Sequence, residues 1–320
     1  MKKEPLSFHP FLKTVLWGGT KISRYKNIES EEPNVGESWE ISAIPGHVSV
    51  VSDGVYKGRT LDELVDEFGE DLLGRRVTER YGKTFPLLVK FIDAADNVSI
   101  QVHPGDALAR ARHNSLGKTE MWYIIDSDPG AKILAGLKER MTPEDYMRRI
   151  SDKTFADAIA VHDSNPGDVF FLPAGKVHAI GAGNLLAEIQ ASSDITYRIY
   201  DYDRRDGSGH TRELHTQLAK DAIDYSLYSA YKSPSPSADI KDCEIVKCPE
   251  FTIRRIIVDG CHELISDSGS FVILMCIDGE ATLKYEEGES VIRRGQTMFL
   301  PAVLKHVNLE GSATILLIHI

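Results

Sequence analysis

Residues 91–125 read FIDAADNVSIQVHPGDALARARHNSLGKTEMWYII and contain two short β-strand patterns joined by a polar loop. Successive side chains of a strand point to opposite faces, so every second residue shares a face. Each pattern places three such residues together: Ser99, Gln101 and His103 in the first, and Lys118, Glu120 and Trp122 in the second. If the two strands pair antiparallel with these faces inward, an amide oxygen, an imidazole, a carboxylate and an ammonium group meet. The stretch therefore predicts a divalent metal site with a cation beside it.

The composition is that of a globular protein whose charge disfavours nucleic acid and anionic membranes as partners. The 320 residues are 42% hydrophobic and 27% charged, enough for two domains with cores of their own. The net charge of −11 has the wrong sign for a surface that binds phosphate backbones or acidic lipids. A small anionic substrate would need a local basic cavity. No protein partner is evident from the sequence.

The targeting features of the sequence favour the cytoplasm. The N-terminus shows no long apolar run after its lysines, which predicts the absence of a signal peptide. No apolar stretch approaches the length of a membrane span. The four cysteines lie between residues 243 and 276 without C-x-x-C spacing, which predicts reduced thiols. We therefore expect a cytoplasmic protein.

Helical insertions are predicted at three places among the strand patterns of the first part of the chain: about residues 60–80, 142–160 and 211–226. Thr60 and Glu63 have the spacing of a capping box at the start of the first insertion. Thr142 and Pro143 combine a helix cap with a proline in the first turn of the second. These insertions are small beside the β-structure, so the fold class predicted is mainly β.

A linker rich in proline and serine is predicted at residues 229–240, SAYKSPSPSADI. It would separate a metal-binding domain, residues 1–228, from a smaller domain, residues 241–320. Nearly every segment after the linker has the pattern of a short strand followed by a glycine-containing turn. This spacing is typical of an all-β sandwich or barrel.

An internal repeat links the two predicted domains. Residues 167–178 read GDVFFLPAGKVH, and residues 295–306 read GQTMFLPAVLKH. Each copy has a glycine, five residues and a proline, and then a histidine five residues after the proline. Two copies of one β unit predict two related barrels. In the second copy Val303 replaces a glycine and His306 has no upstream partners, so we expect a degenerate barrel without a metal site.

The first copy resembles the second conserved motif of the cupins, double-stranded β-helix or jelly-roll barrels that hold a metal inside. The resemblance rests on Gly167-x5-Pro173-x-Gly175-x2-His178. It implies a fold of two cupin barrels with small helical insertions.

The first cupin motif normally supplies His-x-His and a Glu, and this chain has Gln101-x-His103 and Glu120 instead. That replacement, with SIQVHPGD, GKTEMWY and SSDITYRIYDYDR around it, resembles the short form of the type I mannose-6-phosphate isomerases. The resemblance implies four metal ligands: Gln101, His103, Glu120 and His178. It also implies one zinc ion per chain, although the ligand set alone would admit manganese, iron or cobalt. Gln101 is alternatively a residue that supports another ligand without touching the metal.

The same resemblance implies roles for residues around the metal. Arg198 matches the arginine treated as catalytic in the family, with structural pairing to Asp194 or Asp201 as the alternative. Lys118 is expected to enter the cavity and bind substrate, with a surface ion pair as its alternative. Glu188 and Asp194 lie in the same family block, and we expect both to contact substrate. Either could be the carboxylate that moves a proton.

The resemblance implies reversible interconversion of mannose 6-phosphate and fructose 6-phosphate through an enediol as the function. Two alternatives remain at this point. One is a cupin oxygenase or decarboxylase that uses iron or manganese, although such enzymes usually have more histidine ligands. The other is a sugar-binding cupin without catalytic activity, which would not need two cations converging on a metal.

Overall fold

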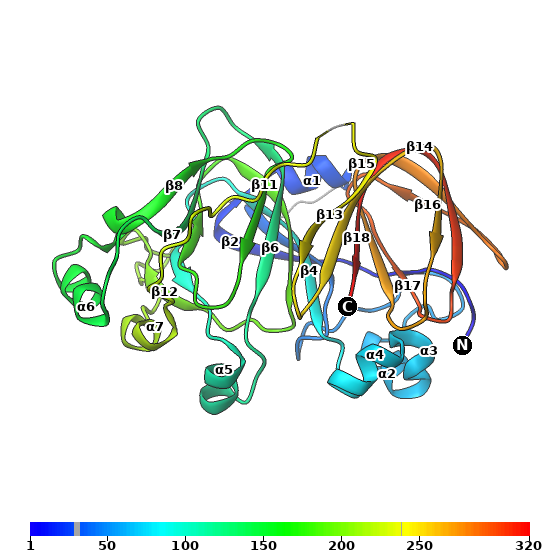
Figure 1. Ribbon diagram of the computed structural model, residues 1–320, viewed down its shortest axis with the longest axis horizontal. Coiled ribbons are helices and arrows are strands. Elements are labelled where there is room, and N and C mark those ends of the chain that lie inside the picture. Colours follow the sequence, from blue (N-terminus) through cyan, green and yellow to red (C-terminus); the bar gives the residue numbers. More distant parts are fainter. Residues whose placement is uncertain (29–32, 238) are drawn as a thin grey trace.

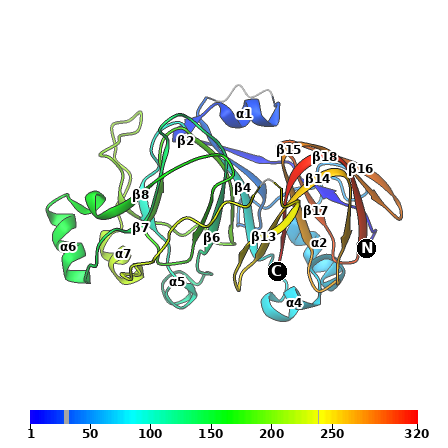
Figure 2. The ribbon, with the colours of Figure 1, turned by 45° about the horizontal axis from the view of Figure 1, so that its top comes forward.

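The protein folds mainly into antiparallel β-sheet, as predicted (Figure 1). The computed structural model describes residues 1–28, 33–237 and 239–320. The strands form three sheets, and Figure 2 shows those of the first two thirds of the chain beside that of the last third. Among the described residues, no helix combines the length and apolar character needed to cross a membrane.

The largest sheet of the first part of the chain has six antiparallel strands. In spatial order they are β2 (Phe11–Gly19), β3 (Val35–Ile41), β4 (Leu87–Ala94), β11 (Asn184–Ala191), β6 (Glu120–Ser127) and β9 (Val169–Leu172). A five-stranded sheet faces it, in the order β12 (Tyr197–Tyr200), β5 (Ile100–Val102), β10 (His178–Ile180), β7 (Lys132–Leu137) and β8 (Ile159–Asp163).

Apolar side chains fill much of the space between these two sheets. Trp122 and Phe170 from the six-stranded sheet share one buried cluster with Ile133 and Ile180 from the five-stranded sheet. Because side chains alternate along a strand, the opposite faces are free to pack elsewhere. The two sheets therefore enclose a common interior, and this interior also contains the cavity described below.

The third sheet is built almost entirely from the last part of the chain. Its strands in order are β1 (Leu6–Ser7), β17 (Thr297–Leu300), β15 (Val272–Tyr285), β18 (His306–His319), β14 (Thr252–Ile265) and β13 (Asp242–Lys247), and β16 (Gly288–Arg293) pairs with β15 along the same edge as β17. The short N-terminal strand β1 pairs with β17, so both ends of the chain contribute to this sheet.

The repeat forms the same strand–turn–strand unit in both places. In the first copy β9 ends at Leu172 and β10 begins at His178; in the second β17 ends at Leu300 and β18 begins at His306. His306 has a half-exposed side chain, and its Nε2 lies 2.7 Å from Oε1 of Glu263.

The first strand pairing expected from the sequence was wrong. β5 and β6 do not pair with each other; β5 pairs with β10 and β12, and β6 with β9 and β11. The two strands lie in facing sheets, and the loop between them contains helix α5 (Asp106–His113). The inward direction of the polar side chains is nevertheless correct, because facing sheets turn one face of each toward the common interior.

The predicted helical insertions exist, but the first is broken into three pieces and the helices of the other two are shorter than expected. Residues 60–80 hold three pieces, α2 (Leu61–Phe68), α3 (Glu70–Leu73) and α4 (Arg75–Tyr81), separated by Gly69 and Gly74. Gly74 has φ +89°, and its Cα packs so closely against the backbone of Gly269 that a side chain would clash. Residues 142–160 form α6 (Pro143–Ser151) and a 3-10 turn, Phe155–Ala158. Near the N-terminus, α1 spans Lys21–Lys26.

In the third insertion only α7 (Thr216–Ala222) is helical, and the residues before it make contacts outside a helix. Arg212 forms an ion pair with Asp201, and the backbone N–H of His215 donates a hydrogen bond of 2.7 Å to the carbonyl of Arg198. At the other end, the N–H of Asp224 donates to the carbonyl of Gly175 at 2.8 Å.

The segment predicted as a linker is anchored on the six-stranded sheet where it is described. The N–H of Ser233 donates to the carbonyl of Val169 at 2.9 Å, and Lys232 forms an ion pair with Asp168. Tyr231 packs against Gly136 so closely that a Cβ there would clash with its ring. Residue 238 lies outside the described residues, and the domain boundaries at 229–240 stay a prediction.

Candidate metal centre and active site

A cavity of about 350 Å³ lies between the six-stranded and five-stranded sheets, which is within the size range of small-molecule sites. Basic side chains outnumber acidic ones in its walls. The basic ones are Lys13, Lys90, Lys118, Arg198 and Arg212, and the acidic ones are Glu37, Glu188 and Asp194. In a chain with a net charge of −11 this local surplus favours an anionic ligand.

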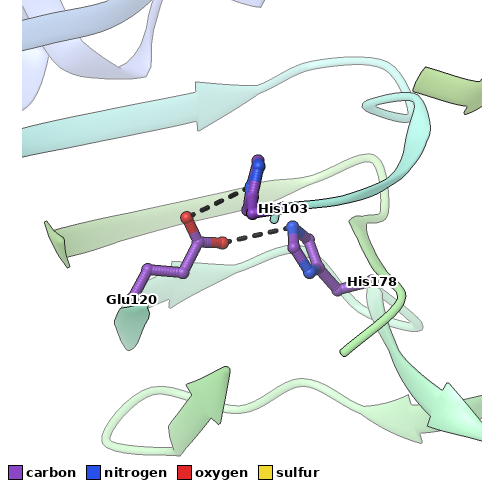
Figure 3. A group of neighbouring side chains, drawn as sticks. All are labelled: His103, Glu120 and His178. Carbon is purple, nitrogen blue, oxygen red and sulfur yellow. Dashed lines mark ion pairs between the residues drawn. The ribbon is translucent and has the colours of Figure 1, made fainter. Parts of the chain in front are cut away.

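Three potential metal ligands from different strands meet in one group (Figure 3). His103 follows β5, Glu120 begins β6, and His178 begins β10. The Glu120 Oε2 lies 3.5 Å from Nε2 of His103, and Oε1 lies 3.2 Å from Nε2 of His178. The ligand atoms all lie within 4.8 Å of one another, and the three side chains are almost completely buried. Gln101 and Lys118, which contact this group, line the cavity itself.

The hydrogen bonds of the two histidines turn their free ring nitrogens toward Glu120. Nδ1 of His103 donates to the carbonyl of Ile195 at 2.8 Å, and Nδ1 of His178 donates to the carbonyl of Lys176 at 2.8 Å. A carbonyl only accepts, so Nδ1 carries the proton and Nε2 keeps a lone pair. Burial lowers the pKa of His103 well below its ordinary range and the pKa of His178 to about 3. Both rings are therefore neutral and oriented as metal ligands.

Glu120 is a buried carboxylate that a cation would stabilise. Its side chain has no solvent exposure, and burial raises its pKa, while the charge of Lys118 acts in the opposite direction. The Lys118 Nζ lies 3.0 Å from Oε2. Within the described residues, Nε2 of His103 and Oε1 of Glu120 have no hydrogen-bond partner. Unpartnered buried ligand atoms around one point fit a divalent ion, since the ion would compensate the cost of their burial.

Gln101 lies beside the group but presents its amide nitrogen. The Gln101 Nε2 is 3.3 Å from Nε2 of His178, and its Oε1 accepts from the hydroxyl of Ser99 at 3.5 Å. An amide oxygen is the atom that binds metals. Gln101 would therefore serve as a fourth ligand after rotation of the amide by half a turn.

Arg198 lies in the five-stranded sheet on the strand next to Gln101, in register with Gln101 and His178. The strand register pairs Arg198 with Gln101, and Gln101 with His178. The Arg198 Nη1 donates to the carbonyl of Glu213 at 3.0 Å, and its Nε is buried without a partner. Burial and the nearby charge of Arg212 lower its pKa.

The structural alternative for Arg198 is not observed. Among the described residues, no carboxylate lies within ion-pair distance of its guanidinium, and Asp201 pairs with Arg204 and Arg212 instead. Asp194 is exposed at the edge of the cavity. Arg198 therefore keeps its charge available to a ligand in the cavity.

Glu188 is deeply buried in the cavity wall and paired with a lysine. Its Oε1 accepts from Lys90 Nζ at 3.0 Å, and its Oε2 accepts from the indole N–H of Trp122 at 2.8 Å. Burial acts to raise the pKa of Glu188, but the charges of Lys90 and Lys118 and the hydrogen bonds from Lys90 and Trp122 together outweigh it, and the pKa falls to about 2. A carboxylate with so low a pKa is a weak proton acceptor.

Lys90 and Glu37 also line the cavity, and neither was predicted from the sequence as a site residue. Lys90 stands alone in the apolar run FPLLVKFIDA, and Glu37 lies in GESWEIS next to a tryptophan. A single lysine in a strand that is otherwise buried on both faces was a usable signal, because such a charge needs a partner. Its partner could not be identified without knowing the order of the strands.

Comparisons with known proteins agree with this geometry. Residues 6–132 match the family model "Phosphomannose isomerase type I, catalytic domain", and residues 241–320 match "Mannose-6-phosphate isomerase, cupin domain". The chain is 36% identical to mannose-6-phosphate isomerase ManA of Bacillus subtilis, over 100% of both chains. It is 33% identical to the mannose-6-phosphate isomerase of Streptococcus mutans, over 99% of this chain and 98% of that one.

A solved structure shares the complete fold. The crystal structure of mannose 6-phosphate isomerase from Bacillus subtilis superimposes with a TM-score of 0.89 at 33% identity, covering 99% of each chain. The cupin fold and the family resemblance predicted from the sequence are confirmed. The chain belongs to the type I mannose-6-phosphate isomerase family.

Proposed function

We propose that this chain interconverts mannose 6-phosphate and fructose 6-phosphate in the cavity beside the metal-ligating group. The observation that carries the proposal is the buried group His103, Glu120 and His178 beside a cavity wall with a surplus of basic side chains. The names of the relatives, which match over essentially their full length, support the same substrate pair. An aldose–ketose isomerase that acts on a sugar phosphate needs both a site for developing oxyanion charge and a cationic environment.

We propose zinc as the metal, held by His103, Glu120 and His178, with Gln101 as fourth ligand after its amide has turned. Two neutral imidazoles, one amide and one carboxylate would leave a divalent ion with net positive charge. Bound there, the ion would supply Lewis-acid stabilisation of negative charge on O1 and O2 of the sugar. The donor set also suits manganese, iron and cobalt, so zinc rests on the family resemblance.

Residues of the cavity wall would stabilise charge and bind the substrate. Isomerisation moves a proton between C1 and C2, and negative charge develops on the oxygens as an enediol forms. Arg198, which has no carboxylate partner among the described residues, stabilises that charge. Lys118 contacts the substrate while it remains beside Glu120. Glu188, which is buried, and Asp194, which is exposed, both line the cavity and accept hydrogen bonds from sugar hydroxyl groups.

The direct test is to incubate the purified protein with fructose 6-phosphate and to measure mannose 6-phosphate by NMR or by a coupled assay. We expect product to form, to cease after chelation, and to return when zinc is restored. Binding of fructose 6-phosphate without any product in the metal-replete sample would contradict an isomerase and indicate a sugar-binding cupin. Consumption of oxygen or release of carbon dioxide from another substrate, with no isomerisation, would indicate an oxygenase or decarboxylase.

A further inference from the structure

Four charged side chains of alternating sign cross the cavity wall in one row. They come from neighbouring strands of the six-stranded sheet: Lys13 on β2, Glu37 on β3, Lys90 on β4 and Glu188 on β11. The Lys13 Nζ lies 3.3 Å from Oε1 of Glu37, the Lys90 Nζ lies 3.5 Å from Oε2 of Glu37, and the Lys90 Nζ lies 3.0 Å from Oε1 of Glu188. All four line the cavity.

The strand register explains why the row forms. Lys13 stands directly opposite Glu37, and Lys90 stands directly opposite Glu188. Lys90 is also opposite Trp39, so Glu37, two residues before Trp39, is its diagonal neighbour. Direct and diagonal neighbours on one face are within reach of long side chains. The side chains become more buried along the row, from 43% exposed at Lys13 to 4% at Glu188.

Glu37 occupies the junction of this row and is itself fixed in place. The indole N–H of Trp39 donates to its Oε2 at 2.7 Å. The same oxygen faces the Lys90 ammonium, and the other faces Lys13. Burial acts to raise the pKa of Glu37, but the charges of Lys90 and Lys13 outweigh it and the pKa is lowered. The carboxylate is therefore charged, and its direction is set from three sides.

The geometry leaves one donor of Lys90 for the cavity. An ammonium group has three N–H donors. One donates to Glu188, the ammonium lies 3.5 Å from the Glu37 carboxylate and 5.1 Å from the centre of the Trp39 ring, and within the described residues no further acceptor lies at hydrogen-bond distance. The Trp39 ring gives the ammonium a weak, non-directional contact, so Glu188 and Glu37 are the two charges that fix its direction.

We propose that Glu37 is a positioning residue for the isomerase reaction: it fixes the Lys90 ammonium between two carboxylates so that its third N–H faces an oxygen of the bound sugar phosphate. This inference rests on the isomerase activity proposed above. Glu37 does not itself touch the reacting atoms. It acts on Lys90, whose position relative to the substrate it determines.

Glu37→Gln tests the proposal, because glutamine keeps the size and can still accept from Trp39 while the charge that holds Lys90 is lost. We expect kcat to fall roughly 10- to 100-fold, the range that a misplaced group can cost, with KM changed less than threefold and bound metal unchanged. Glu37→Asp keeps the charge but shortens the reach, so its kcat should lie between those of the glutamine variant and the wild type.

Glu40→Gln is the matched control. Glu40 lies on the same strand, is also buried, and pairs with Lys26 at 2.7 Å, but it does not line the cavity. Its replacement removes a buried carboxylate at similar cost to folding and should leave kcat within about twofold of wild type.

The outcomes separate this inference from the activity on which it rests. A wild-type protein without isomerase activity contradicts the proposed function. An active wild type with Glu37→Gln within twofold of its kcat, or no more impaired than Glu40→Gln, contradicts the positioning role alone. If Glu37→Gln does not fold, Glu37→Asp decides: a wild-type kcat there would also overturn the inference.

Discussion

At the scale of single residues, Arg198 is a cation of the cavity wall for which we propose a role in binding the anionic substrate. Its guanidinium has no carboxylate within ion-pair distance among the described residues, although Asp201 and two further arginines lie nearby. A structural arginine in a cavity wall would normally be paired, because an unpaired buried charge is costly. The absence of a pair is therefore the feature that a bound anion would explain.

Arg198→Ala should lower kcat by roughly 10²- to 10³-fold, the usual cost of removing a group that stabilises developing negative charge. Bound zinc and melting temperature should stay near the wild-type values, because Arg198 contacts none of His103, Glu120 and His178 by a polar bond. Steady-state kinetics with metal analysis of the same preparation checks both.

Arg205→Ala is the control, since Arg205 is exposed and does not line the cavity. The kcat, bound zinc and melting temperature of this variant should match those of the wild type. Loss of metal or of folding in Arg198→Ala would instead assign Arg198 a structural role.

At the scale of elements, the pair of Lys90 and Glu188 joins β4 to β11 inside the cavity wall. The pKa of Glu188 falls from 4.5 to about 2, so the pair contributes stability above pH 4.5 that is lost as the pH falls toward 2. Burial acts to lower the pKa of Lys90, but Glu188 and Glu37 raise it above its ordinary value, so the lysine stays charged throughout this range.

Glu188→Gln should therefore destabilise the protein most near neutral pH, and the difference from wild type should shrink between pH 4.5 and pH 2.5. Denaturant unfolding of both proteins at a series of pH values measures this. Glu310→Gln breaks the exposed pair with Lys284 and should change stability little at any pH. A difference for Glu188→Gln that stays constant or grows in acid would contradict the paired, ionised carboxylate.

Among the elements, local turns could be predicted from the sequence, but the pairing of distant strands could not. The turn before His178 was predictable, because Pro173-x-Gly175 and its repeat specify a strand–turn–strand unit locally. The partners of β5 were not, since β10 and β12 follow much later in the chain and pairing over such separations leaves no local pattern. For the same reason, the contact of Glu37 with Lys90 could not be predicted from the sequence. That contact depends on the strand order β3, β4, β11 and not on either segment alone.

At the scale of the whole molecule, the chain contains two copies of one β unit, and the histidine at the end of each copy has a different environment. His178 is buried beside Glu120, whereas His306 has a 54% exposed side chain that pairs with Glu263. The overall class and the repeat were predictable because period-2 patterns and glycine turns are local. The packing of α2 to α4 against the third sheet was not, because close contacts such as that of Gly74 with Gly269 arise only when both parts have folded.

The central claim is that isomerisation depends on one divalent ion held by the buried group of the first barrel. Zinc should be titrated into metal-free protein while bound zinc and the rate of conversion of fructose 6-phosphate are recorded together. We expect the rate to rise with bound zinc and to level off at one equivalent per chain in wild type and in His306→Ala, and to stay at background in His178→Ala. Full turnover by the metal-free protein, or a His178→Ala titration that matches wild type, would contradict the account.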